Sequence, residues 1–197
     1  MDDSIIRLNY HKKRLANQHR CDSTLVVDEL GIQNGKCRAD IAVINGRMTG
    51  IEIKSDRDTL DRLPAQVDAY NKIFDFIMLV SGPKHIDKAK MMIPNWWGLI
   101  EATIGPRSAI NFRTVRRAKL NNAVDDSSVA RLLWKSESLA IVEELGLASM
   151  PSRANKKALS DLLASNMTSK ILRAQVRDAL KSRLDWRDQG PPVIYGG

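Results

Sequence analysis

The sequence has few of the residues that build disulfide frameworks or zinc centres. Its 197 residues include two cysteines, Cys21 and Cys37, whose separation is far from the paired spacing of a zinc site. The histidines His11, His19 and His85 are scattered, no His-x-Glu motif accompanies them, and we assign them no role. These scarcities argue against a disulfide scaffold and against zinc chemistry, and they are typical of a protein of a reducing cytoplasm.

Long apolar runs and phosphate-binding glycine loops are also missing. No apolar run approaches the roughly 20 residues that cross a bilayer, so we expect no membrane span. The first residues, Met1 to Ser4, are acidic and lack a signal-peptide pattern. No glycine-rich loop leads into Lys-Ser or Lys-Thr, which argues against a P-loop nucleoside triphosphate site. We therefore expect a cytoplasmic protein.

Positive charge, by contrast, is plentiful. The chain holds 31 lysines and arginines against 23 acidic residues, a net charge of +8. A basic surface attracts polyanions, so nucleic acid is the leading class of partner, although many basic proteins bind none. The remaining composition, 43% hydrophobic and 27% charged, is ordinary for a globular protein. The length allows one sizeable core with a small appendage.

Hydrophobic patterning over the first 120 residues alternates helices with strands. Helices are predicted over 4–18, with Ser4 as N-cap, and over 60–72 and 86–92. Strands are predicted over 24–30, 38–44, 48–55, 74–80, 95–102 and 110–115. Gly31 ends the first strand in this interpretation, and Pro64 fits its helix only within the first turn. This order predicts an α/β fold, a mixed sheet flanked by helices.

The character of the sequence changes near Asn121, after which it predicts helices only. Helices are expected from Ser127 to Gly146, over 155–165 and over 168–184, with a loose tail over 189–197. We therefore divide the chain into 1–120 and a small all-α module, 121–197. Residues 151–184 carry eight basic residues against two acidic ones. The last two helices resemble a SAP-type helix-extended-helix DNA-binding module; a helical cap on the first domain and a dimer interface are the alternatives.

The predicted hairpin 38–55 places three charged residues on one face. Glu52 and Lys54 alternate with isoleucines, and Asp40 is followed by a similar alternation. Because side chains alternate between the faces of a sheet, burying the apolar sets together brings Asp40 onto the face of Glu52 and Lys54. A two-residue turn at Asn45-Gly46 would pair Asp40 with Ile51 instead. We therefore predict a three-residue loop or a bulge there.

Two carboxylates that converge on one spot repel each other, and a divalent cation relieves that repulsion. Mg²⁺ or Mn²⁺ prefers oxygen ligands, which Asp40, Glu52 and the backbone carbonyl of Ile53 can supply. Lys54 can orient or deprotonate an attacking water, or bind a phosphate. Alternation of charged and apolar residues on a half-exposed sheet is the simpler explanation of Glu52 and Lys54 taken alone.

An Asp followed by Glu-x-Lys on the next strand resembles the PD-(D/E)xK nuclease superfamily, here from about Val26 to Val80. Gln66 and Tyr70 on the following helix match the QxxxY element of some of its branches. The resemblance implies a restriction-endonuclease-like fold, metal ligation by Asp40 and Glu52, and a catalytic set of Asp40, Glu52, Lys54, Gln66, Tyr70 and the upstream acid Glu29. Ala39 replaces the proline of the motif, and Glu29 lies on a strand rather than on the first helix. Without this context Gln66 would be a solvated residue and Tyr70 a core aromatic.

A closer resemblance is to phage and bacterial proteins that combine this core with a helical C-terminal extension. It rests on the runs Glu29-Leu30-Gly31, Arg38-Ala39-Asp40-Ile41, Glu52 to Asp56, Asp58 to Leu63 and Trp96-Trp97-Gly98. It implies residence in a bacterial cell or a phage-infected host. Superfamily members often form dimers to cut both strands, so the resemblance also allows a homodimer.

Basic residues near the site, at the domain junction and in the helical module are candidates for DNA contact. They are Arg38, Arg57, Arg62, Arg113, Arg116, Arg117, Lys156, Lys157, Lys170 and Arg173. For Arg57 and Arg62 the alternative is a helix-entry charge cluster. For Arg38 it is neutralisation of Glu52, and for the run 113–119 and the helical module it is a solvated face.

Three functions are compatible with these patterns. The first is a Mg²⁺- or Mn²⁺-dependent deoxyribonuclease. The second is a catalytically silent nuclease fold that retains DNA affinity, and the third is a phage–host interaction protein that uses its helical segment. The complete set of Asp40, Glu52 and Lys54 favours the enzyme.

Overall fold

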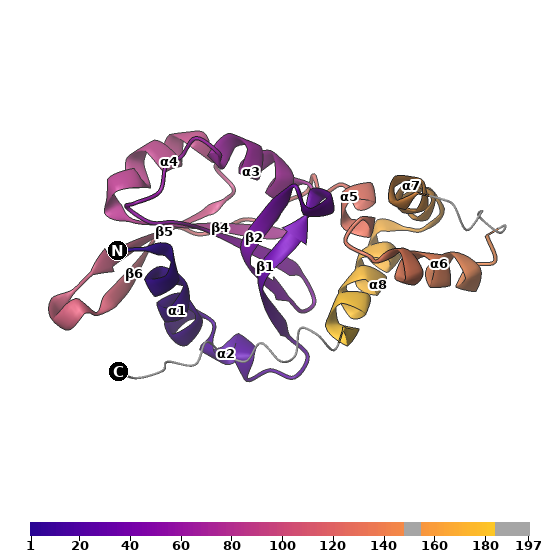
Figure 1. The fold of residues 1–197 in the computed structure, drawn as a ribbon, viewed down its shortest axis with the longest axis horizontal. Coiled ribbons are helices and arrows are strands. Elements are labelled where there is room, and N and C mark those ends of the chain that lie inside the picture. The colour runs from indigo at the N-terminus through magenta and orange to yellow at the C-terminus, as the bar shows by residue number, and fades with distance from the viewer. Residues whose placement is uncertain (148–154, 184–197) are drawn as a thin grey trace.

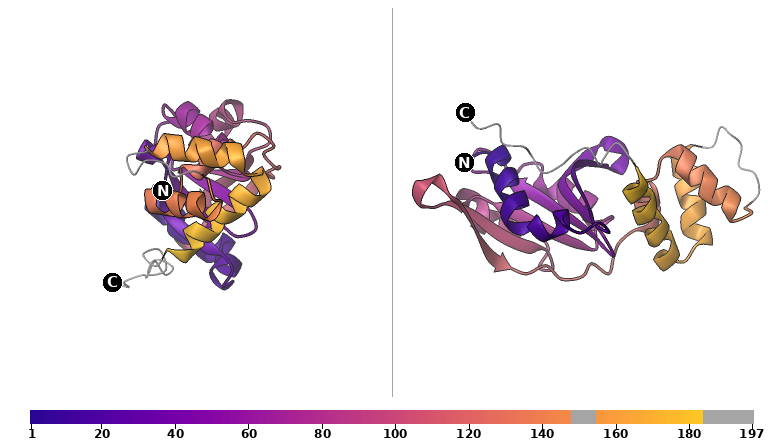
Figure 2. Two further views of the ribbon diagram at one scale, coloured as in Figure 1. Left: turned by 90° about the vertical axis from the view of Figure 1, so that its right-hand side faces the viewer. Right: turned by 90° about the horizontal axis from the view of Figure 1, so that it is seen from below.

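The computed structural model describes residues 1–147 and 155–183. A six-stranded sheet forms the centre, and four helices gather at one end of an elongated molecule (Figures 1 and 2). The strands are β1 (Leu25–Ile32), β2 (Cys37–Ile44), β3 (Met48–Lys54), β4 (Phe76–Ser81), β5 (Gly98–Ile104) and β6 (Ile110–Arg116). The main helices are α1 (Asp3–Arg14), α2 (Ala16–His19), α3 (Leu63–Asn71), α4 (Ile86–Met92), α5 (Asp126–Ala130), α6 (Lys135–Glu144), α7 (Lys156–Asn166) and α8 (Ser169–Ser182).

The sheet is mixed, and its strands lie in the order of the sequence, β1 to β6. β4 runs parallel to both β3 and β5, and the remaining neighbours are antiparallel. The predicted α/β class, a mixed sheet flanked by helices and followed by C-terminal helices, is therefore confirmed. None of the helices in the described ranges is both long and apolar enough to cross a membrane.

Helices cover both faces of the sheet, as Figure 1 shows, with α3 and α4 on one face and α1 on the other. The alternation of side chains along β2 and β3 determines which face of the sheet each side chain occupies. Ile41 and Ile51 pack in one cluster with Ile6 of α1. Their neighbours Ala42 and Met48 belong to the opposite cluster, which contains α3. Glu52, which is in phase with Met48, therefore lies on the α3 face, where Gln66 and Tyr70 contact it.

The first helix is shorter than predicted and begins one residue earlier. Its N-cap is Asp2 rather than Ser4, because the Asp2 carboxylate accepts from the Ile5 amide at 3.1 Å. The helix ends at Leu15, whose backbone (φ −113°, ψ 9°) separates α1 from α2. Gly31 does not end β1, which continues to Ile32, so the prediction that it does is wrong.

The starts of α3 and β5 also differ from the predicted boundaries. α3 begins at Leu63, with Pro64 in its first turn as predicted. The strand predicted to start at Asn95 starts at Gly98. Trp97 precedes it and is fully buried, with its indole donating to Asn71 at 2.8 Å.

The single helix predicted over 127–146 is two helices, because the chain turns between Ala130 and Lys135. Side chains of Asp125, Asn155 and Thr168 cap α5, α7 and α8. The last helix ends at Ser182. Residue 184 and the tail 189–197 lie outside the described residues.

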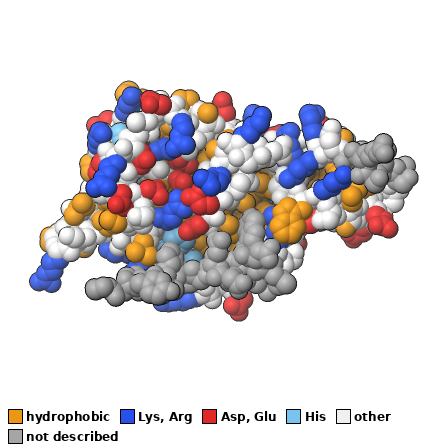
Figure 3. Space-filling view, viewed as in Figure 1, with side chains coloured by type: hydrophobic (Ala, Val, Ile, Leu, Met, Phe, Trp, Pro, Cys, Tyr) orange, Lys and Arg blue, Asp and Glu red, His pale blue; other side chains and the backbone are white. Residues whose placement is uncertain are grey.

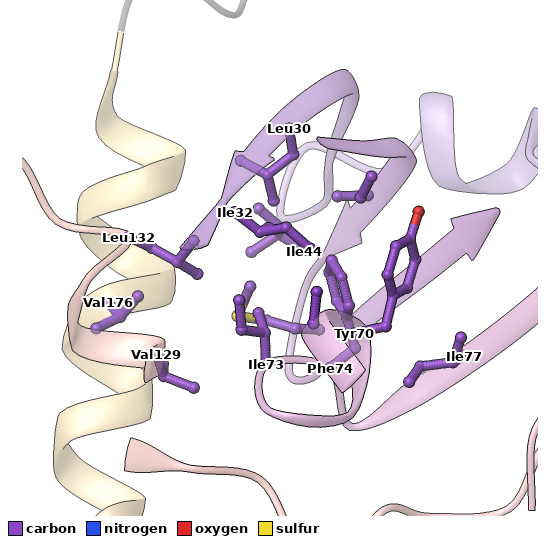
Figure 4. Packing of buried hydrophobic residues seen from close by; sticks show 14 of the residues in the cluster. Leu30, Ile32, Ile44, Tyr70, Ile73, Phe74, Ile77, Val129, Leu132 and Val176 are labelled. Atoms are coloured by element: carbon purple, nitrogen blue, oxygen red, sulfur yellow. The ribbon is translucent and has the colours of Figure 1, made fainter. Parts of the chain in front are cut away.

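The C-terminal helices share the core of the sheet. Figure 4 shows Leu132 pointing toward Ile32 and Ile44 of the sheet, and Leu132, Val129 and Val176 all belong to one apolar cluster with these two residues. The connecting segment is fixed by the Asn121 amide group, which donates to the carbonyls of residues 71 and 74 at 2.7 and 3.0 Å. The inner surface of the helices is therefore a cap on the sheet, one of the alternatives read from the sequence.

Candidate functional site

The β2–β3 hairpin has a three-residue loop, as predicted. Ile44 pairs with Met48 and Ile41 with Ile51, which leaves residues 45–47 as the loop. This register places Asp40 and Glu52 on the same face. Asp40 Oδ2 also accepts from the backbone amide of Ile53 at 2.6 Å, so its carboxylate is fixed against β3.

A third carboxylate continues the row onto β1. The pairs Asp28–Ile41 and Leu30–Ala39 set Glu29 beside Asp40. Glu29 has a left-handed backbone (φ 56°), a conformation that non-glycine residues rarely adopt within a strand. One carboxylate from each of three adjacent strands thus lies at the same end of the sheet.

Glu52 is buried in a network of donors. Lys54 Nζ approaches its Oε1 at 2.7 Å, Gln66 Nε2 reaches the same oxygen at 2.5 Å, and the Tyr70 hydroxyl donates to Oε2. The side chains of Glu52 and Lys54 are only 1% and 5% exposed. A buried ion pair persists only where its remaining hydrogen-bonding capacity is met, and here α3 meets it. The Gln-x-x-x-Tyr spacing therefore does bring both residues to the predicted site.

α3 aims these two side chains because residues four apart lie on the same side of a helix. Its other contacts hold it in place. The Tyr70 ring packs between Phe74 and Trp97, at centroid distances of 5.2 and 5.7 Å. Figure 4 shows the hydroxyl at the outer end of this ring, away from the core. The aromatic core role and the site role of Tyr70 are therefore combined in one residue.

Burial and mutual repulsion perturb both carboxyl groups. Burial, and then the nearby Glu52, raise the pKa of Asp40 from 3.8 to about 8, although the Ile53 amide and Arg7 act in the opposite direction. Burial also raises the pKa of Glu52, against the effects of Lys54, Tyr70 and Gln66. Without a further cation, one of the two groups holds a proton near neutral pH.

These groups line an open cavity of about 770 Å³. Its walls include all but Tyr70 of the predicted catalytic and metal-binding residues, namely Glu29, Asp40, Glu52, Ile53, Lys54 and Gln66. Acidic and basic side chains gather together in the middle of this face of the molecule (Figure 3). The mixture of charges suits a site for a cation together with an anion.

Sequence reasoning missed two residues of α1 at this site. Arg7 forms ion pairs with Asp3 (3.1 Å), Glu29 (2.6 Å) and Asp40 (3.4 Å). Asp3 also lines the cavity. The spacing of Asp3 and Arg7, four apart on a helix, was a visible signal. Nothing in the sequence indicated that this helix packs on the sheet where Arg7 can reach Glu29 and Asp40.

The predicted DNA contacts in the first 116 residues have four different environments. Arg38 and Arg62 line the cavity, and Arg38 Nε also lies 3.2 Å from Glu29. Arg57 is exposed, 3.8 Å from Asp2. Arg113 pairs with Glu101 at 2.8 Å. Arg116 donates to the carbonyls of residues 94 and 97 at 3.0 and 2.7 Å, so its guanidinium stabilises the chain before β5.

Those on the C-terminal side also differ. Arg117, Lys157 and Lys170 are exposed, and Lys156 is half-buried. Arg173 pairs with Asp126 at 2.6 Å and donates to the carbonyl of Val124 at 3.0 Å. Its charge therefore fixes α8 to the start of α5 and is less exposed to solvent than that of Lys157 or Lys170.

No group of three or more His, Cys, Asp or Glu side chains in the described ranges is arranged to hold a metal ion. Mg²⁺ needs fewer, since it keeps several waters and takes one or two carboxylates with substrate phosphate. Two observations fit such a hydrated ion. The carboxyls of Asp40 and Glu52 resist joint ionisation, and the buried Oε1 of Gln66 has no hydrogen-bond partner, so it can accept from a metal-bound water.

Comparison with known proteins gives a family. The sequence model described as Bacteriophage P4 protein cII matches residues 6–189. A curated relative, Protein cII of Enterobacteria phage P4, is 25% identical over 158 residues, which are 80% of this chain and 59% of the relative. The chain thus spans about three-fifths of the length of that relative. No solved structure matches. With almost its whole length matched, the chain belongs to the Bacteriophage P4 protein cII family.

Proposed function

We propose that this protein is a metal-dependent deoxyribonuclease of the PD-(D/E)xK type, which hydrolyses phosphodiester bonds in DNA. The observation that carries the proposal is the convergence of Asp40, Glu52, Lys54 and Gln66 on one open cavity, with the Tyr70 hydroxyl donating to Glu52 from behind the cavity wall. A row of surface charges on a sheet would not need two donors from another element. A buried carboxylate that accepts hydrogen bonds from three side chains and lies beside a second carboxylate is typical of a catalytic site.

Asp40, Glu52 and the Ile53 carbonyl would hold Mg²⁺ or Mn²⁺. When bound, the ion would activate a water molecule and stabilise charge on the phosphate. Asp40 contributes the oxygen that is not bonded to the Ile53 amide, and Glu52 contributes lone pairs left by its three donors. The protein residues thus supply few ligands and leave coordination positions for water and phosphate.

Lys54 supplies the positive charge closest to Glu52 within the cavity. Its ammonium group, 2.7 Å from Glu52, has further donors that can reach an attacking water or a phosphoryl oxygen. Gln66 and Tyr70 are positioning residues, because they fix the Glu52 carboxylate rather than contact substrate. The unpartnered Oε1 of Gln66 can orient a water in the cavity.

Basic side chains around the cavity would hold the DNA backbone. Arg38 and Arg62 line the cavity itself. Exposed Lys157 and Lys170 extend positive charge over the helical cap, and the whole chain carries +8. Phosphate neutralisation by such residues predicts affinity that falls steeply with salt.

The test is cleavage of supercoiled, linear and single-stranded DNA with Mg²⁺ or Mn²⁺. Wild type is expected to cut, and Asp40→Ala and Lys54→Ala are each expected to lose about 10²-fold or more in rate. Asp61→Ala and Lys12→Ala, which remove exposed charges away from the cavity, are the matched controls. If wild type and both variants bind DNA equally tightly and none of them cuts it, the nuclease proposal is wrong and the catalytically silent DNA-binding alternative replaces it. Metal-independent binding to a host protein without DNA affinity would favour the interaction alternative.

A further inference from the structure

The guanidinium of Arg7 lies between α1 and the row of carboxylates. Its three acidic partners belong to three elements, Asp3 on α1, Glu29 on β1 and Asp40 on β2. Its side chain is 16% exposed, so these contacts form in a partly desolvated place where charge interactions are stronger than at the surface. Arg7 is the cation that faces Asp40 in this structure.

The two carboxylate oxygens of Asp40 have different partners. Oδ2 accepts from the Ile53 amide at 2.6 Å, and Oδ1 faces Arg7 Nη2 at 3.4 Å. The oxygen left for another cation is thus the one that faces the guanidinium. This contact is also the longest of the three ion pairs of Arg7, against 2.6 Å to Glu29 and 3.1 Å to Asp3. Arg7 can therefore release Asp40 and remain anchored through its other two partners.

We propose that Arg7 is a positioning residue that acts as the resident counter-ion of Asp40 and sets the divalent-cation affinity of the site by competing for Oδ1. This inference rests on the proposed function, since it assumes that Asp40 binds a cation. It adds a control on metal loading. A phosphate that enters the cavity offers the guanidinium another anion, so DNA would help to free Asp40 for the ion.

Competition has a defined sign. Arg7 Nη2 and a divalent ion would both face Oδ1 of Asp40, so the positive charge of the guanidinium opposes binding of the ion. Removing the guanidinium therefore favours binding of the ion. Keeping a positive charge at position 7 should preserve the competition.

The experiment is calorimetric titration of the full chain with Mn²⁺, without DNA, for wild type, Arg7→Gln, Arg7→Lys and Arg14→Gln. Arg14 is the control, because it lies on the same helix but donates to Thr114 of β6 at 3.0 Å. We expect Arg7→Gln to bind Mn²⁺ roughly tenfold more tightly than wild type. Arg7→Lys and Arg14→Gln should remain within about twofold of wild type. Circular dichroism confirms that each variant is folded at the titration temperature.

The outcomes separate the two proposals. If wild type binds Mn²⁺ and folded Arg7→Gln binds it no more tightly, the proposed role of Arg7 is wrong. The nuclease proposal is not affected by that result. Binding by Arg7→Gln alone supports the role of Arg7 in its strongest form. Binding by neither overturns both proposals. An equal gain in Arg14→Gln would show a general effect of net charge and would also overturn the role of Arg7.

Discussion

At the scale of single residues, opposing interactions act on the carboxyl group of Asp40. It is largely buried, stands beside Glu52 and Glu29, and has Arg7 and one backbone amide as its donors. Burial and the neighbouring carboxylates favour its protonated form, whereas metal binding requires the ionised form. A residue chosen only for stability would not carry a charge at this position.

Asp40→Asn should therefore stabilise the metal-free protein at alkaline pH. The pKa of Asp40 is raised from 3.8 to about 8, so the folded state holds a proton that the unfolded state has lost between these values. The associated stability is present below about pH 4 and is lost as pH rises through about 8. Urea unfolding from pH 4 to 9 should show a fall for wild type that is smaller in Asp40→Asn. A steeper fall in the variant would contradict the raised pKa.

Strand periodicity and a family resemblance together predicted five of the site residues. Alternation in the hairpin placed Asp40, Glu52 and Lys54 together, and the resemblance to the QxxxY element added Gln66 and Tyr70. Arg7 and Asp3 escaped prediction because their roles depend on where α1 packs. That packing is a tertiary property that a local pattern does not report.

At the scale of elements, the β2–β3 hairpin determines whether a site exists. Its three-residue loop was predicted from the demand that Asp40 share a face with Glu52, and the register of Ile41 with Ile51 confirms it. Helix ends were predicted less well. The break at Leu15 and the turn between α5 and α6 interrupt sequences whose apolar spacing continues, so no breaker residue marks them.

The hairpin also packs closely against Phe74, which lies between α3 and β4. A Cβ atom at Gly50 of β3 would lie 2.5 Å from the ring of Phe74. Gly50→Ala should therefore destabilise the protein by about 1–3 kcal/mol, the usual cost of overpacking. Gly46→Ala in the loop is the matched control, since its Cβ would meet nothing within 4 Å. Chemical denaturation measures both, and equal effects would contradict the close packing at β3.

At the scale of the whole molecule, the sheet and the C-terminal helices form one apolar core. The change of character near Asn121 was read from the sequence, but the packing of the helices on the sheet was only one of three alternatives, because an amphipathic pattern does not identify the surface that a helix packs against. Leu132 and Val176 lie in the same cluster as Ile32 of β1. This shared cluster joins the sheet, which carries the candidate site, to the helices that carry the exposed Lys157 and Lys170.

Leu132→Asp should consequently destabilise the sheet as well as the helices. Leu132 is 7% exposed, and a charge buried there is expected to cost about 4 kcal/mol or more. Leu145→Asp, at a leucine that is 40% exposed, is the control and should cost little. Circular dichroism and tryptophan fluorescence during urea unfolding should show one shared transition that moves in Leu132→Asp. Two separate transitions, with only the helical one displaced, would contradict a shared core.

The most direct test of the proposed site is a paired measurement of Mn²⁺ binding and DNA cleavage on the same preparations of wild type, Asp40→Asn and Lys54→Ala. Wild type should bind the ion and cut, Lys54→Ala should bind the ion with little cutting, and Asp40→Asn should do neither. This pattern would separate a metal ligand from a residue that acts on water and phosphate. Undiminished Mn²⁺ binding by Asp40→Asn, or cleavage by either variant at the wild-type rate, would contradict the assignment of the site.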